Sequence, residues 1–289
     1  MDRSGPAWAN PVKDLDCIAF LQWALPRLGL HWPGFRKVRR QVCKRIARCM
    51  RELGLADVAA YRARLEGDPA EWRALGALCT IPLSRFYRDR EVFDCLGAEV
   101  LPALARGAQR LECWSAGCAS GEEPYTLAIQ RRLALAARFP RLELGILGTD
   151  VDARLLERAR AACYGASSLE ALPQDWRLQA FGRRGRQWCL RKGFRDHVEL
   201  AQQDLLAALP EREFHLVLCR NLAFTYFDAE GARRALERIA RRLRPGGALV
   251  IGIHERLPAP AEGFAPWPGC RAVFRWNPGR AVRAVSTSA

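Results

Sequence analysis

The sequence lacks a long uncharged apolar run. No stretch of the 289 residues approaches the roughly 20 apolar residues that a transmembrane helix needs. The opening segment, Met1 to Lys13, carries charges and two prolines but no hydrophobic core of the kind that signal peptides have. We therefore expect no membrane insertion and a cytoplasmic location.

Several chemical signatures are also missing. The eleven cysteines form neither a C-x-x-C pair nor a Cys/His group at zinc-ligand spacing, and the four histidines suggest no catalytic dyad. No G-x-S-x-G, H-E-x-x-H or Walker-type loop occurs. We predict no metal site, and we interpret the cysteines as buried small hydrophobic residues in a reducing compartment, not as a disulfide framework.

Lysine is scarce, since it accounts for four of the 46 basic residues and arginine for the rest. The formal net charge of +15 indicates an anionic partner, which composition alone does not identify as a protein, a nucleic acid or a membrane surface. Eight basic residues gather from Arg36 to Arg51 with no acidic residue among them. Apolar residues recur there at helical spacing, which predicts an amphipathic helix. Its basic face either docks an acidic partner or is simply solvated.

The order of expected elements divides the chain. Residues 14–80 should form a helical domain and residues 81–92 a connector. From residue 93 to 280, strands alternate with helices, which is typical of a mostly parallel sheet covered on both faces. A basic segment at residues 164–196 breaks this rhythm and predicts an inserted β-subdomain with a hairpin turn at Arg183–Gly185.

The expected elements can be placed along the chain. The helical domain should contain helices at 14–28, 34–53, 57–65 and 68–78. The expected strands are Leu111–Ser115, Leu142–Leu147, His197–Ala201, Phe214–Cys219 and Ala248–Ile253. The helices between them are expected at Tyr125–Ala137, Ala153–Ala162 and Ala229–Leu243.

A run of small residues joins the first expected strand to the next helix. Trp114–Tyr125 reads W-S-A-G-C-A-S-G-E-E-P-Y. Such a turn is where α/β folds hold nucleotide-like cofactors, and small residues such as Gly117 let the backbone approach a ligand. Glu122 and Glu123 would repel phosphates, so a ligand with hydroxyls and positive charge, such as S-adenosylmethionine, fits better. The alternative is an ordinary glycine-containing turn.

Acidic residues follow the second and third expected strands. Asp150 ends the second strand, where a carboxylate can accept hydrogen bonds from both ribose hydroxyls, and Asp152 is suited to cap the next helix. Asp204 and Leu205 follow the third strand, where a polar residue could meet the adenine amino group and a leucine could contact the ring. Alone, this last pattern is not specific.

The loop after the fourth strand carries Arg220, Asn221 and Tyr226. Ligands of open α/β sheets bind at this edge, and these residue types could orient a carboxylate. The alternatives are a structural salt bridge for Arg220 and core packing for Tyr226.

Together these strings resemble the CheR-type protein-glutamate O-methyltransferases of bacterial chemotaxis, over about residues 30–275. The resemblance also rests on the connector Thr80–Arg88, which reads T-I-P-L-S-R-F-Y-R and is similar to the family's T-x-N-x-T-x-F-F-R. It rests further on R-A-A-C-Y at 160–164, and on L-R-P-G-G at 243–247 with G-I-H-E at 252–255.

The resemblance implies a Rossmann-like methyltransferase domain that bears a small β-subdomain and follows a small all-helical domain. It also implies methyl transfer from S-adenosylmethionine to glutamate side chains of a chemoreceptor-like protein. An acidic helical segment of that receptor would dock on the helix Arg36–Arg51, and we expect a monomer.

The resemblance also assigns site residues. The cofactor-binding positions that it supplies are Ser84, Arg88, Glu123, Asp150, Asp204, Leu205, Arg220 and Asn221. We add Gly117 of the small-residue loop to this set. We further predict, from the chemistry of these residues, that Arg88, Arg220 and Tyr226 are catalytic, with Arg220 and Tyr226 near the acceptor and Arg88 helping to neutralise charge. A glutamate carboxylate is ionised near neutral pH, so no general base is needed.

Three departures from the family pattern keep alternatives open. Pro82 replaces the connector asparagine, the string from Arg220 to Phe227 is one residue longer than usual, and G-I-H-E stands where G-H-S-E is usual. The longer string allows a methyltransferase for another carboxylate, on a different protein or a small molecule. Pro82 allows a regulator that binds the cofactor without catalysis. The charge allows a nucleic-acid methyltransferase, but no aromatic-interleaved basic motif or N-P-P-Y string favours it.

Overall fold

A computed structural model describes residues 14–81 and 84–279. Within these residues the chain forms two compact units. The helical unit contains residues 14–81 together with Tyr226–Asp228, and the α/β unit contains residues 84–225 and 229–279. Pro82, one of the departures from the family pattern, lies outside the described residues.

The helical unit is built from short helices with polar caps. They are α1 (Asp14–Ala24), a 3-10 turn (Leu25–Leu28), α2 (Trp32–Phe35), α3 (Arg39–Glu52), α4 (Val58–Gly67) and α5 (Pro69–Cys79). Asp57 caps α4 by accepting from the amide of Ala60 at 2.8 Å, and Asp68 caps α5 by accepting from Ala70 at 2.8 Å. These two starts were predicted.

The helix predicted over residues 34–53 is wrong in one respect, because α2 and α3 are separate helices. A turn at residues 36–38 divides them. Phe35 before the turn and Val42 after it are both buried in the core of this unit. The basic residues from Arg36 to Arg51 therefore begin in the turn and continue along α3.

A segment far along the chain completes the helical unit. Leu30 and Phe227 form an antiparallel bridge. Two backbone hydrogen bonds flank the bridge, from His31 to the Tyr226 carbonyl and from Asp228 to the Gly29 carbonyl, each at 2.9 Å. The ring of Tyr226 lies 5.0 Å from that of Phe35.

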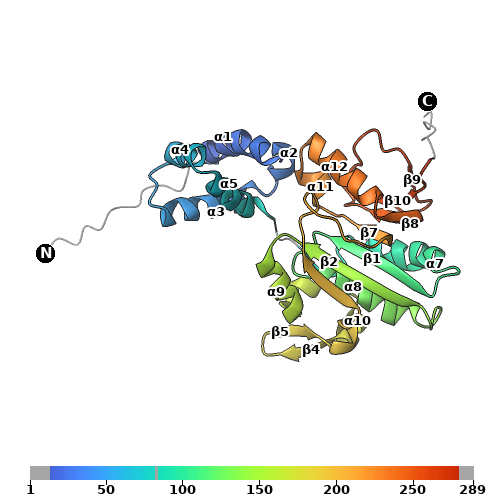
Figure 1. Ribbon diagram of the computed structural model, residues 1–289. Helices are drawn as coiled ribbons and strands as arrows, with labels where there is room; N and C mark the ends of the chain where they lie inside the picture. Colours follow the sequence, from blue (N-terminus) through green and yellow to red (C-terminus); the bar gives the residue numbers. More distant parts are fainter. Residues whose placement is uncertain (1–13, 82–83, 280–289) are drawn as a thin grey trace, which may run out of the picture. The chain divides into compact units, whose positions relative to one another are not determined.

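The α/β unit is organised by a seven-stranded sheet (Figure 1). Its strands, in spatial order, are β6 (Val198–Gln202), β2 (Glu143–Asp150), β1 (Arg110–Ala116), β7 (Phe214–Leu218), β8 (Leu243–Val250), β10 (Val273–Trp276) and β9 (Phe264–Pro266). The first five run parallel, and β10 is antiparallel to both β8 and β9. This order confirms the predicted Rossmann-like class.

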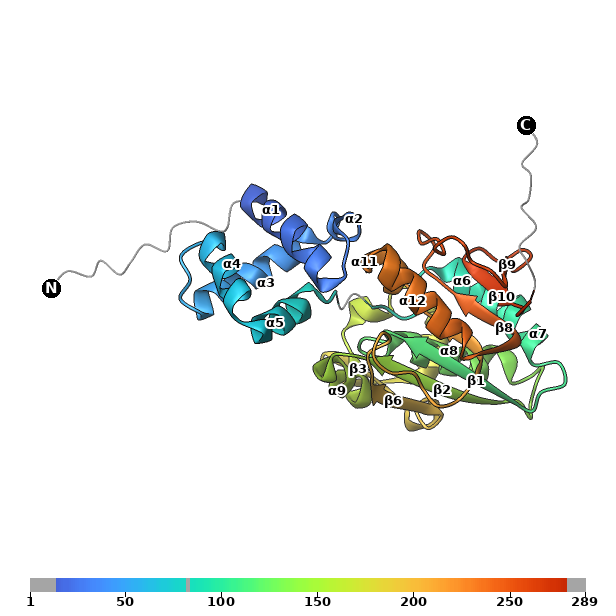
Figure 2. The same ribbon diagram turned by 45° about the horizontal axis from the view of Figure 1, so that its top comes forward.

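Helices cover both faces of the sheet (Figure 1). The helices of this unit are α6 (Arg90–Cys95), α7 (Leu101–Leu104), α8 (Glu122–Gln130), α9 (Ala153–Ala161) and α12 (Ala229–Ala240), while α11 (Ala223–Tyr226) follows β7 and α10 (Gln174–Ala180) contacts β4 of the inserted segment. Figure 2 shows α9 beside β6. Side chains of β1 alternate between the faces, because Leu111 and Cys113 pack in one cluster with Leu127 of α8, whereas Trp114 points to the opposite face.

The predicted insertion forms a small antiparallel sheet. Its strands are β3 (Cys163–Tyr164), β5 (Gln187–Leu190) and β4 (Phe181–Arg184), in that spatial order. The hairpin between β4 and β5 turns at Gly185, which has φ +60°. The small β-subdomain is therefore inserted between β2 and β6 of the larger sheet, as the pattern at residues 164–196 predicts.

The expectation that no cysteine is paired is wrong for six of the eleven. Disulfides join Cys17 to Cys43, Cys95 to Cys270 and Cys163 to Cys189. The remaining five fit the expectation better, since all except Cys49 are buried. The spacing of the cysteines along the sequence did not indicate these disulfides, because each disulfide joins residues from different elements of the fold.

Within residues 14–81 and 84–279, no helix is both long enough and apolar enough to cross a membrane.

Candidate functional site

Four of the predicted site residues come from the ends of neighbouring strands, or from the loops after them, at one edge of the sheet. Strands β2, β1 and β7 are neighbours and run parallel, so their carboxyl ends lie side by side. Gly117 follows β1, Asp150 ends β2, and Arg220 and Asn221 follow β7. This is the edge at which open α/β sheets bind ligands.

The small-residue loop is held against the end of β2. The amides of Gly117 and Cys118 donate to the Thr149 carbonyl at 2.8 and 2.9 Å. Gly117 has φ +77°, and a Cβ there would lie 2.5 Å from Cδ2 of Leu222, so the missing side chain leaves room for the loop after β7. The loop therefore depends on glycine both for its backbone conformation and for its packing.

Asp150 ties this loop to β2. Its Oδ2 accepts from the Ala119 amide at 2.9 Å, and its Oδ1 accepts from the Asp152 amide at 3.0 Å. The side chain is buried, and burial raises the pKa of this carboxyl. Asp152 is the helix cap, since it accepts from the Arg154 amide at 2.9 Å. The predicted capping role of Asp152 is confirmed.

Arg220 lies between two carboxylates. Its Nη1 donates to Oε2 of Glu123 at 3.0 Å and its Nη2 to Oδ2 of Asp89 at 2.7 Å, with only 2% of the side chain exposed. Glu123 also accepts from the hydroxyl of Ser115 at 2.7 Å. The guanidinium lies over the ring of Phe93 at 5.2 Å. The salt bridge that stood as the alternative interpretation of Arg220 is present, and Asp89 is a partner that the sequence pattern did not single out.

Glu255 fixes the loop that carries Arg220 and Asn221. Its Oε2 accepts from the amides of Asn221 and Gly252 at 2.9 and 2.5 Å, and its Oε1 accepts from the Thr225 hydroxyl at 2.5 Å. Asn221 has φ +54°, a conformation that needs such support. Its Oδ1 accepts from Nη2 of Arg88 at 3.2 Å. The sequence signal for Glu255 was its place in the string G-I-H-E.

The two adjacent glutamates of the loop face different surroundings. Glu123 meets Arg220, whereas Oε1 of Glu122 accepts from the hydroxyls of Ser168 at 3.2 Å and Ser120 at 3.4 Å. Glu122 is buried, and burial raises its pKa even though Ser168 and Ser84 oppose that shift. Ser84 and Glu122 line a cavity of about 470 Å³. The predicted connector residue Ser84 therefore lies beside the loop after β1.

The two predicted adenine residues lie in the loop after β6. Asp204 is exposed, and its Oδ1 accepts from the Leu206 amide at 2.8 Å within its own loop. Leu205 is buried, and its carbonyl accepts from Nε of Arg238 at 2.7 Å. Tyr226, in contrast, belongs to the helical unit, where it packs with the core cluster. Among the described residues, no group of three or more His, Cys, Asp or Glu is placed to hold a metal ion.

Gly121 offers a test of how tightly the loop is packed. It has φ +89°, and a Cβ would lie 2.9 Å from Cε2 of Tyr125 and 3.0 Å from Cβ of Ala159. We expect G121A to destabilise the α/β unit by about 2 kcal/mol, because backbone strain and overpacking add. Urea unfolding measures the change.

Gly107 is the matched control for this substitution. Its φ is +79°, but nothing lies within 4 Å of the place that a Cβ would occupy. The variant G107A should therefore cost only the backbone strain, about 1 kcal/mol. Equal losses for G121A and G107A would contradict the inferred packing of Tyr125 and Ala159 against Gly121.

Comparison with known proteins finds similarity over both units. The family description "CheR methyltransferase, SAM binding domain" matches residues 83–271, and "CheR methyltransferase, all-alpha domain" matches residues 37–77. A chemotaxis protein methyltransferase of Listeria monocytogenes is 36% identical over 187 residues, which are 64% of this chain and 70% of the relative. One from Klebsiella aerogenes is 32% identical over 280 residues, which are 91% of this chain and 92% of the relative.

A solved structure is also similar. The N-methyltransferase NodS from Bradyrhizobium japonicum, in complex with S-adenosyl-L-homocysteine, has 18% sequence identity and a TM-score of 0.33. The match covers 57% of this chain and 63% of that chain.

Proposed function

Since the chain belongs to the CheR methyltransferase family, which makes it an S-adenosylmethionine-dependent methyltransferase of the chemotaxis type, we propose that it methylates glutamate side chains of a chemoreceptor-like protein. The products are glutamyl methyl esters. The observation that carries this proposal is the family match over residues 83–271, which includes the loops around Gly117, Asp150 and Arg220.

The residues at the sheet edge fit S-adenosylmethionine. Asp150 lies at the end of β2, where its carboxylate can accept from ribose hydroxyls, and the turn that Gly117 makes after β1 brings the loop backbone to the same edge. Nε of Arg220 is buried and has no hydrogen-bond partner in the described part of the chain, so a donor remains for an anionic group. When bound, the cofactor supplies a methyl group activated by a sulfonium.

The protein's own task in this reaction is alignment and exclusion of water. Ser84, Glu123, Asp204, Leu205 and Asn221 complete the proposed cofactor set. Arg88, Arg220 and Tyr226 are the proposed catalytic residues. Arg88 and Arg220 match the family's motif positions, whereas Tyr226 is proposed from its place in the same loop as Arg220. Arg220 is already paired with two carboxylates, which keeps it from binding the acceptor carboxylate too tightly and lowering its nucleophilicity.

The proposed docking surface is the exposed basic face of α3. Arg40, Lys44 and Arg48 are exposed and recur every four residues, so they lie on one side of the helix. Arg45 does not belong to this face, because its Nη1 donates to the carbonyls of Leu78, at 3.2 Å, and Thr80. An acidic helical segment complements the exposed stripe by charge.

The test of the proposed function is a methylation assay with labelled cofactor and chemoreceptor cytoplasmic fragments. The expected result is base-labile label on receptor glutamates. Label on another protein or a small molecule, with none on the receptor, would favour the rival carboxylate acceptor. Cofactor binding without transfer to any acceptor would favour a regulator.

Charge reversal on α3 tests the docking surface. We expect R40E/K44E to raise the KM for the receptor fragment by about tenfold or more and to leave cofactor affinity unchanged, because it reverses two exposed charges that act on the acceptor protein. Receptor methylation at varied fragment concentration measures the effect. The control R233E/R234E makes the same charge change at exposed positions of α12. Equal KM values for both double variants would refute docking on α3.

A further inference from the structure

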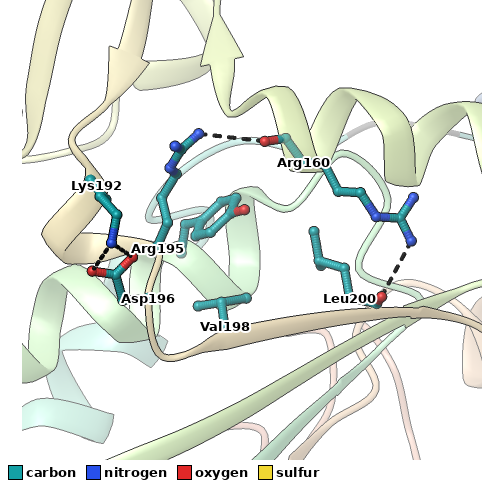
Figure 3. Close-up of a pocket in the computed structure, with 7 residues that line it drawn as sticks. Arg160, Lys192, Arg195, Asp196, Val198 and Leu200 are labelled. Atoms are coloured by element: carbon teal, nitrogen blue, oxygen red, sulfur yellow. Dashed lines mark hydrogen bonds and ion pairs between the residues drawn. The ribbon is translucent and has the colours of Figure 1, made fainter.

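A basic pocket lies outside the site described above. It has a volume of about 360 Å³ and is lined by Tyr125, Arg160, Lys192, Arg195, Asp196, Val198 and Leu200. Arg160 lies near the end of α9, and Lys192 and Arg195 lie between β5 and β6. Figure 3 shows these cationic side chains around Val198 and Leu200, which belong to β6 at the edge of the large sheet.

The two arginines of this pocket have no carboxylate partner among the described residues. Nη2 of Arg160 donates to the Leu200 carbonyl at 3.3 Å, and Nη1 of Arg195 donates to the Arg160 carbonyl at 3.5 Å. Lys192, by contrast, pairs with Asp196 at 3.0 Å. Each guanidinium therefore keeps donors for a ligand, since a guanidinium carries five N–H groups.

The two guanidinium groups act on the same region of the pocket. The hydroxyl of Tyr125 donates to the Ala159 carbonyl at 2.9 Å. Burial raises the pKa of Tyr125 to about 12, while Arg195 and Arg160 both work to lower it. Both arginines therefore act on Tyr125, which lines the same pocket.

We propose that this pocket binds a phosphate monoester whose organic part is apolar. Three cationic side chains and one carboxylate leave a net charge of plus two among the lining residues. A phosphate monoester carries about −1.5 to −2 at pH 7 and matches that charge, whereas a single carboxylate leaves part of it uncompensated. The planar fork of arginine fits phosphate oxygens, and the partly exposed side chains of Val198 and Leu200 line the pocket for the apolar part.

Calorimetric titration with phenyl phosphate at low ionic strength tests this site. The expected result is saturable binding of one molecule, weakened by about tenfold or more in R160A/R195A because the charge-assisted hydrogen bonds are lost. The control R184A/R186A removes the same charge from exposed positions of the β-subdomain and should bind within about twofold of the parent chain. R160K/R195K keeps the charge without the planar fork, so its affinity for phenyl phosphate should lie between those of R160A/R195A and R184A/R186A.

Two outcomes would overturn the proposal. One is unchanged phenyl phosphate binding in R160A/R195A, with folding confirmed by circular dichroism and by intact S-adenosylmethionine binding. The other is benzoate binding as tightly as phenyl phosphate. Inorganic phosphate and a phosphoserine peptide with apolar neighbours identify the source. Tighter binding of the peptide than of phenyl phosphate assigns the site to a phosphorylated protein, and the reverse order assigns it to a small phosphorylated molecule.

Discussion

Replacing Arg220 with methionine is expected to destabilise the α/β unit by about 3–5 kcal/mol, the loss typical of breaking a buried ion pair from one side. The guanidinium is almost fully buried and donates to Glu123, Asp89 and the carbonyl of Arg88. Methionine fills much of the same volume but leaves both carboxylates without their cation. Urea unfolding, followed by far-ultraviolet circular dichroism, measures the change in the free energy of unfolding.

Two further variants show whether uncompensated charge is the cause. In R220M/E123Q/D89N the carboxylates are replaced by neutral amides, and we expect part of the lost stability to return. In R244M the broken pair is a half-exposed one, Arg244 with Glu213 at 3.9 Å, and the expected loss is below about 1 kcal/mol. A loss for R220M as small as that for R244M would contradict the buried network.

The variant D150A is expected to weaken S-adenosylmethionine binding by about 100-fold, or ~2.7 kcal/mol. Two contributions add, because the variant removes a charged acceptor for the ribose hydroxyls and also the acceptor that holds the Ala119 amide at 2.9 Å. Calorimetric titration with the cofactor measures the affinity. D150N keeps an oxygen for Ala119 without the charge and should lose less.

Asp152 supplies the matched control for this prediction. D152A removes a helix cap and should reduce stability by about 1 kcal/mol with little change in cofactor affinity. If D150A binds S-adenosylmethionine as tightly as the parent chain does, Asp150 is not a cofactor-binding residue. Because burial raises the pKa of Asp150, affinity should also begin to fall at a higher pH on acidification than it would with an exposed aspartate.

Features set by local sequence were the ones that could be predicted. The strand Leu111–Ser115 lies within β1, and Asp57, Asp68 and Asp152 cap the helices that follow them. Apolar runs report buried strands, and a side chain that accepts from an amide two or three residues ahead needs no tertiary partner. The same locality explains why the hairpin around Gly185 was found.

Features set by distant residues could not be predicted. Asp89 pairs with Arg220, which lies 131 positions away, and no spacing rule connects them. Strands β9 and β10 were missed because they are only three and four residues long and carry little pattern. The disulfides join Cys95 to Cys270 and two other distant pairs. Such partners emerge only from the packed fold.

The bridge between Leu30 and Phe227 has a consequence for the order of synthesis. Residues 14–81 are translated before the sheet, whereas Tyr226–Asp228 are translated only after β1, β2, β6 and β7. The N-terminal helices therefore lack Phe227, the bridge partner of Leu30, until most of the strands of the sheet have been translated. A truncated chain that ends before Tyr226 would lack that partner altogether, so the N-terminal helices should be studied together with the distant segment that completes them.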